Sequence, residues 1–144
     1  MSVGIGADAV IAVTFFPNYA AATKLTSAYV KNADGAFVPG STDGVTAAAE
    51  AALADFPADF RQAPIINGAG ADTYPIASYT YLLVYQDQTN ADKGQALVSF
   101  LYWALTDGQA TEASLGYAPL PKEVQEKALA ELHLVATGGS PIWP

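Results

Sequence analysis

The 144-residue sequence contains no cysteine, and this absence limits more than any other feature how the chain can fold. Disulfide bridges, thiolate zinc sites and iron–sulfur clusters are excluded together, so a hydrophobic core must hold the fold. The composition supplies that core, since 51% of the residues are hydrophobic and only 14% are charged. A domain of this length buries roughly 70% of the surface that its unfolded chain exposes. We therefore expect one globular domain or two small lobes.

The charge balance restricts the partners. Fourteen acidic and six basic residues give a formal net charge of −8, and Arg61 is the only arginine. Such a field repels nucleic acid and anionic membrane surfaces, and the basic patch that nucleic-acid binding needs is missing. A small anion is still acceptable, because main-chain amides can hold one inside a net-negative protein.

The sequence also argues against catalysis. His133 is the only histidine, so a multi-histidine metal site is excluded, and no Gly-x-Ser-x-Gly nucleophile motif is present. We expect no enzyme, no metal and no cofactor. We expect His133, near the end of a predicted helix, to serve in capping or surface packing. No segment reaches the roughly 20 apolar residues of a membrane span. The first apolar run is not preceded by the basic residues that begin a signal peptide.

Strand-like segments occur in three places. Residues 9–16 (AVIAVTFF) are β-branched and aromatic without alternation, which predicts a strand buried on both faces. Residues 27–31 and 36–38 predict a hairpin, with Gly35 in the left-handed region of its turn. Residues 76–85 (IASYTYLLVY) alternate first and are then continuously apolar, which predicts a strand that passes from an edge into a core.

Helix signals alternate with these strands. Ser41, Thr42 and Asp43 can cap a helix rich in alanine. A second helix is predicted over residues 91–107, with Leu97, Phe100, Leu101, Ala104 and Leu105 on its apolar stripe. A third is predicted from Pro121 to about Leu134, followed by a tail. Mixed strands and helices place the chain in the α/β class.

Two places could contact an anion. Thr14 ends the first predicted strand just before a short predicted helix, so Thr14 and its neighbour Phe15 could offer a hydroxyl and free amides to an oxyanion. The alternative is that Thr14 is one more strand residue. Arg61 lies in a segment interrupted by proline and glycine, where it could grip an anion through two hydrogen bonds. Its alternative role is a structural ion pair with one of the fourteen acids.

From Ser27 onward, the order of several motifs resembles the C-terminal part of a known family. The motifs are Ala36–Pro39, Ala71–Val84 (ADTYPIASYTYLLV), Trp103–Gln109 (WALTDGQ), Leu115–Pro121 (LGYAPLP) and Gly139–Trp143. Together they resemble the phosphate-binding protein of bacterial ABC phosphate importers, a type II periplasmic binding protein.

The resemblance implies a fold and a role. The fold would be a partial or single-lobe version of that α/β architecture, with a mixed sheet flanked by helices. Residues 1–60 would belong to the second lobe, residues 61–75 would cross between lobes, and residues 76–144 would return into the first lobe. The chain would bind inorganic phosphate without catalysis and deliver it to ABC permease subunits. It would lie in the periplasm or outside the cell, membrane-anchored in the full-length form.

The sequence departs from the family at two points. The family's proteins are longer, and the Ser-Gly-Thr-type loop that supplies much of their phosphate contact has no counterpart here. Thr14 and Phe15 resemble an early Thr-Phe-Pro anion-binding turn, with Phe16 inserted, whereas residues 12–19 as a whole could instead match a late strand of the second lobe. The alternative function is an interaction module without a ligand, because a partial fold with exposed sheet edges tends to form a homodimer.

Overall fold

The computed structural model describes residues 27–56 and 65–144, which fall into two compact units. Among the described residues, unit 1 holds 27–56, 65–79 and 111–121, and unit 2 holds 80–110 and 122–144. The chain therefore passes from one unit to the other after Tyr79, after Ala110 and after Pro121. The expected division into residues 1–60, 61–75 and 76–144 concerns the lobes of a complete receptor and stays a prediction. The strand predicted over residues 9–16 lies outside the described residues.

Unit 1 begins with the predicted hairpin. Strands β1 (Val30–Lys31) and β2 (Phe37–Val38) pair antiparallel, with Val30 opposite Val38. Gly35 has a φ of 85°, in the left-handed region that glycine adopts without a steric penalty. The hairpin and its turn residue are confirmed.

Helix α2 (Thr42–Ala51) follows, and its start was also predicted correctly. The Ser41 hydroxyl oxygen accepts a hydrogen bond from the Gly44 amide at 3.1 Å, which satisfies one of the free amides of the first turn. A short 3-10 turn, η1 (Leu53–Asp55), comes directly after the helix. The core of unit 1 consists of Ala48, Ala52, Ile65 and Ala77. Small alanine side chains let the residues after the helix approach it closely.

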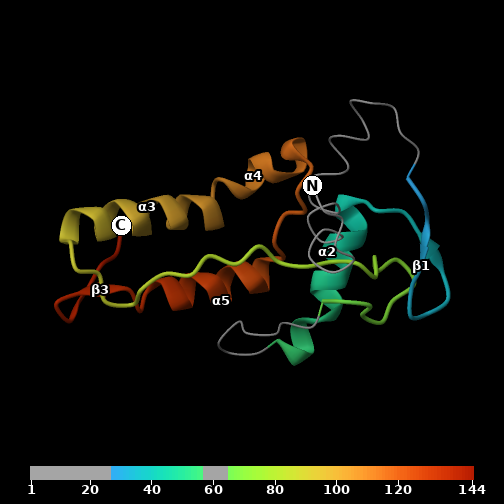
Figure 1. Cartoon of the computed structure of the whole chain (residues 1–144), viewed down its shortest axis with the longest axis horizontal. Helices are drawn as coiled ribbons and strands as arrows, with labels where there is room; N and C mark the ends of the chain where they lie inside the picture. The colour runs from blue at the N-terminus through green and yellow to red at the C-terminus, as the bar shows by residue number, and fades with distance from the viewer. Residues whose placement is uncertain (1–26, 57–64) are drawn as a thin grey trace, which may run out of the picture. The chain divides into compact units, whose positions relative to one another are not determined.

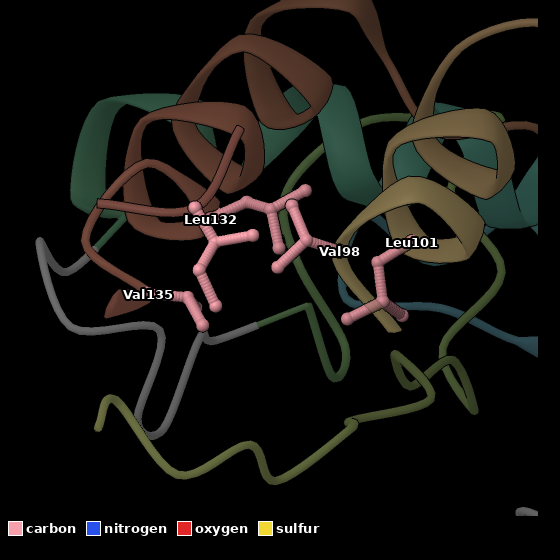
Figure 2. Packing of buried hydrophobic residues seen from close by; sticks show 5 residues of the cluster. Val98, Leu101, Leu132 and Val135 are labelled. Carbon is pink, nitrogen blue, oxygen red and sulfur yellow. The ribbon is translucent and has the colours of Figure 1, made fainter. Parts of the chain in front are cut away.

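Unit 2 is built on two long helices, α3 (Ala91–Leu105) and α5 (Lys122–Leu132). They run in opposite directions, because the chain just before α3 bonds to the chain just after α5, where the Gln88 amide donates to the Ala136 carbonyl at 2.7 Å. The buried core between them consists of Val98, Leu101, Leu132, Val135 and Ile142. Figure 2 shows Val98 and Leu132 meeting between the two helices.

One position of the α3 stripe was predicted wrongly. Phe100 was expected on the buried face, but its side chain is 58% exposed, whereas Val98 is fully buried. The stripe is centred on Val98 and Leu101, so Phe100 falls at its outer edge. After α3 come the short helix α4 (Gln109–Glu112) and the 3-10 turn η2 (Ala113–Leu115).

The C-terminal residues form a second hairpin in place of the expected tail. Strands β3 (Ala136–Thr137) and β4 (Ser140–Pro141) pair antiparallel around Gly138 and Gly139. Both glycines have positive φ, 55° and 79°, as a two-residue hairpin turn of the primed type requires. The Gly-Gly pair was the sequence signal for this hairpin.

The strand predicted over residues 76–85 is not formed in the described part of the chain. Near it lies only an isolated parallel bridge between Asp87 and Ala136. The two sheets of the described residues are separate antiparallel pairs and not the expected mixed sheet. An apolar sequence favours a strand, but a strand also needs a neighbour to receive its hydrogen bonds. The described residues nevertheless keep the α/β character, with helices and small sheets in one chain.

Candidate functional site

The predicted anion contacts Thr14, Phe15 and Arg61 all lie outside the described residues. The structure therefore neither brings them together nor separates them, and each stays a prediction.

The starts of the three long helices are poor anion sites. Each carries an acidic residue in its first turn: Asp43 in α2, Asp92 in α3 and Glu123 in α5. The side chains of Ser41 and Asn90 already accept hydrogen bonds from first-turn amides in α2 and α3. A phosphate would meet an acidic side chain at all three helix starts and engaged amides at α2 and α3, although a helix start is otherwise favourable for anions.

A buried asparagine organises the loops of unit 1. The side chain of Asn32 is only 5% exposed, and its Nδ2 donates to the carbonyls of Gly70 at 3.0 Å, Ala71 at 3.0 Å and Thr73 at 3.2 Å. Its Oδ1 accepts from the Ala36 amide at 3.0 Å. The two N–H groups of Nδ2 thus donate to three carbonyls that lie 38 to 41 residues further along the chain, and they tie the hairpin turn to the loop over residues 68–73.

The loop itself is closed by further hydrogen bonds. The Thr73 hydroxyl lies 2.9 Å from the Gly68 carbonyl and 2.7 Å from the Gly70 carbonyl, and Asp34 accepts from the Gly70 amide at 3.1 Å. Gly70 has a φ of 124°, and a Cβ there would lie 2.9 Å from the Thr73 methyl carbon. We call Asn32, Asp34, Gly68, Gly70 and Thr73 the Asn32 cluster.

Tyr74 attaches this loop to α2. Its amide donates to the Gly44 carbonyl at 3.0 Å, and its ring packs so closely that a Cβ on Gly40 would lie 3.3 Å from its hydroxyl. Desolvation by burial raises the pKa of Tyr74 above its ordinary value. The polar groups of the Asn32 cluster bond to one another, so this cluster stabilises the fold of unit 1 and is not a ligand site. The sequence pattern marked Asn32 only as a turn residue, since nothing local reveals its distant partners.

His133 lies in an aromatic group of unit 2. Its ring stacks on Trp143 with centroids 3.3 Å apart and an interplanar angle of 15°, and Tyr102 meets the same indole edge-on at 5.3 Å. This placement confirms the packing role expected from the sequence.

The described ranges, 27–56 and 65–144, contain no group of three or more histidine, cysteine, aspartate or glutamate side chains that could hold a metal ion. No helix within them is both long enough and apolar enough to cross a bilayer.

Comparison with known proteins identifies relatives. The phosphate-binding protein PstS of Methanocaldococcus jannaschii is 31% identical over 130 residues, which cover 82% of this chain and 33% of that protein. The PstS proteins of Pasteurella multocida and Xylella fastidiosa are 27% and 30% identical over 128 and 103 residues, which cover 87% and 72% of this chain. They cover 37% and 28% of those two relatives, and no protein-family model matches the chain.

The chain thus spans about a third of the length of the curated relatives it matches. These matches confirm the resemblance inferred from the motifs. Over most of its own length this chain is a relative of the PstS phosphate-binding proteins, and it corresponds to about a third of such a protein.

Proposed function

We propose that this chain is part of a solute-binding protein that binds inorganic phosphate, without catalysis, for uptake through an ABC permease in the periplasm or outside the cell. One observation carries the proposal: three relatives from different organisms, each named phosphate-binding protein PstS, match between 72% and 87% of the chain. We further propose that its complete form has the type II periplasmic-binding-protein architecture, with residues 61–75 crossing between lobes.

The chemistry of the chain suits capture of an anion by neutral donors. A net charge of −8 opposes phosphate at long range, so binding must rest on short-range hydrogen bonds from amides, hydroxyls and one guanidinium. Thr14 and its neighbour Phe15 would supply a hydroxyl and main-chain amides, and Arg61 is the only side chain able to form a planar paired contact with phosphate oxygens. Each hydrogen bond to a charged group contributes about 1.5–3 kcal/mol.

The expected affinity follows from the share of the relatives that the chain spans. With about a third of the length, the chain would supply only some of the contacts made by a complete receptor. We therefore expect weak binding, in the millimolar range, equivalent to about −4 kcal/mol.

Isothermal titration and thermal unfolding with phosphate test the proposal, with sulfate at equal ionic strength as the control for salt effects. Phosphate at 100 times its dissociation constant should stabilise the folded state by about 2.7 kcal/mol. Thr14→Ala and Arg61→Gln should weaken the effect, whereas Lys31→Gln, which removes an exposed cation from the hairpin, should not. Absence of both heat and thermal shift at about 100 mM phosphate, roughly 100 times a millimolar dissociation constant, would rule out phosphate binding by this chain.

A further inference from the structure

Asn67 and Gly68 form the only Asn-Gly pair of the sequence. The side chain of Asn67 is exposed, and its backbone has a φ of 50°, the one positive value among the non-glycine residues that the structure describes. Asparagine tolerates this left-handed region better than most residues do. Position 67 thus places a carboxamide in solvent directly before a glycine, whose amide nitrogen has no neighbouring Cβ to shield it.

The two other asparagines that the structure describes are held in place. Asn32 is buried, and its side chain makes hydrogen bonds through both Nδ2 and Oδ1. Asn90 accepts a hydrogen bond from the Lys93 amide at 2.9 Å, and an alanine follows it in the sequence. The Asn67 side chain makes no hydrogen bond within residues 27–56 and 65–144, so it can rotate toward the amide of the next residue.

We propose that Asn67 is a site of spontaneous deamidation, through attack of the Gly68 nitrogen on the side-chain Cγ of Asn67. The Gly68 N–H gives its proton to a base in solvent, the Cγ–N bond of the carboxamide breaks, and ammonia leaves with a proton taken from water. The product of this step is a five-membered succinimide ring. Water then opens the ring at either of its two carbonyls, which yields aspartate or isoaspartate.

The three Asp-Gly pairs of the chain can close the same ring with loss of water, but their glycine amides are already engaged. The amides of Gly35, Gly44 and Gly108 donate hydrogen bonds of 3.0, 3.1 and 2.8 Å. The Gly68 amide makes no hydrogen bond of comparable geometry in the part of the chain that the structure describes. Because an engaged amide must first break its hydrogen bond, Gly68 is the most reactive of these four glycines.

An isoaspartate at position 67 lengthens the loop that the Asn32 cluster closes. It adds one carbon to the main chain immediately before Gly68, whose carbonyl accepts from the Thr73 hydroxyl at 2.9 Å. On the other side, the Asn67 amide donates to the Pro75 carbonyl at 3.0 Å. Hydrogen bonds thus fix both ends of residues 67–75, and an inserted carbon displaces at least one of them. The product also adds a negative charge to a chain that already carries −8.

Ageing of the whole chain tests the reaction. Trypsin releases residues 62–93 as one peptide, which contains both Asn67 and Asn90. After incubation at about pH 8 and about 37 °C, fragment masses should show a gain of about 1 Da at residue 67 and none at residue 90, relative to an unaged sample digested in parallel. Incubation at about pH 5 should slow the conversion at least about tenfold, because fewer Gly68 amides lose their proton. Equal conversion of the two asparagines, or conversion of neither, would overturn the proposal.

Gly68→Ala is the matched control for the nucleophile. It adds a Cβ beside the attacking nitrogen, yet this Cβ would lie 3.9 Å from the nearest side chain, Ala51, so the fold is kept. Conversion of Asn67 should slow about tenfold in this variant. Conversion at the unchanged rate would show that the Gly68 nitrogen is not the attacking group.

Hydrogen exchange tests the effect on the loop. In the isoaspartyl form, separated from the aged mixture by chromatography, residues 65–79 should exchange about 3 to 10 times faster than in fresh protein, as expected for the loss of one hydrogen bond. Freshly prepared Asn67→Asp carries the added charge without the added carbon and should exchange like the unchanged chain. Equal exchange in the isoaspartyl form and in fresh protein would overturn the proposed loosening of the loop.

Discussion

Replacing Asn32 with alanine should release the loop over residues 68–73 from the hairpin. The Asn32 side chain supplies two N–H donors to three carbonyls and one acceptor to the Ala36 amide, all between 3.0 and 3.2 Å. Each hydrogen bond contributes about 1 kcal/mol net, and buried partners left unsatisfied add to the loss. We expect a loss of about 2–4 kcal/mol in the free energy that holds the loop closed.

Hydrogen exchange followed by mass spectrometry measures this loss locally. At 1.36 kcal/mol for each tenfold change, amides in residues 65–79 should exchange about 30 to 1,000 times faster in the variant. Residues 91–105 of α3 belong to the other unit and provide an internal reference. Exchange in residues 65–79 that stays within about twofold of the unchanged protein would refute the role given to Asn32.

Two related variants separate hydrogen bonding from side-chain size. Asn32→Asp should be more damaging than Asn32→Ala near neutral pH, because a carboxylate oxygen would face the three carbonyls that now accept from Nδ2. Acidification should recover part of this loss, since a protonated carboxyl can donate one hydrogen bond. Asp34→Ala removes one exposed hydrogen bond to the Gly70 amide and should cost only about 0.5–1 kcal/mol.

Three further predictions address packing, backbone conformation and pH. Val98→Ala should destabilise unit 2 by about 2–3 kcal/mol, because it removes two buried methyl groups and leaves a cavity. Denaturant titration followed by tryptophan fluorescence should show this loss, since Trp103 and Trp143 both lie in unit 2. A loss of stability below about 1 kcal/mol would contradict the central place given to Val98. Gly70→Ala should destabilise unit 1 by about 1–3 kcal/mol, because Gly70 has a φ of 124° and its added Cβ would lie 2.9 Å from the Thr73 methyl carbon. Gly68→Ala should be nearly neutral, since its Cβ would lie 3.9 Å from Ala51. Equal shifts in the melting temperature of the two variants would contradict backbone strain at Gly70. Burial raises the pKa of Glu112, so the folded state keeps this proton to a higher pH than the unfolded state, and stability falls as pH rises through the two pKa values. Glu112→Gln should therefore raise the melting temperature at pH 7 but not at pH 4. An equal gain in melting temperature at both pH values would contradict this role of Glu112.

Local signals predicted the elements whose boundaries depend on neighbouring residues. Gly35 marked the first hairpin, Ser41 marked the start of α2, and Pro121 preceded α5. In each case a turn or a cap acts within four residues, so the sequence contains the whole interaction. The family motifs are also short stretches of consecutive residues, and the similarity to PstS proteins confirmed the family that they indicated.

The errors arose where a segment depends on distant partners. Residues 76–85 have the composition of a strand but no paired neighbour among the described residues. Phe100 satisfies the helical period of the stripe, yet the position of α5 makes Val98 the buried residue. For the candidate anion site, Thr14, Phe15 and Arg61 remain sequence predictions, since none lies among the described residues.

The sequence by itself determined that an apolar core without disulfides holds this chain, that helices begin at capped positions, and that the chain resembles phosphate-binding proteins. Only the tertiary structure decided that Asn32 joins the hairpin to a loop about forty residues away, and that the side chains of Leu83 and Tyr85 are exposed. The physical reason is range. Caps and turns act between residues close in sequence, whereas burial and long-range hydrogen bonds depend on which distant segments the folded chain brings into contact.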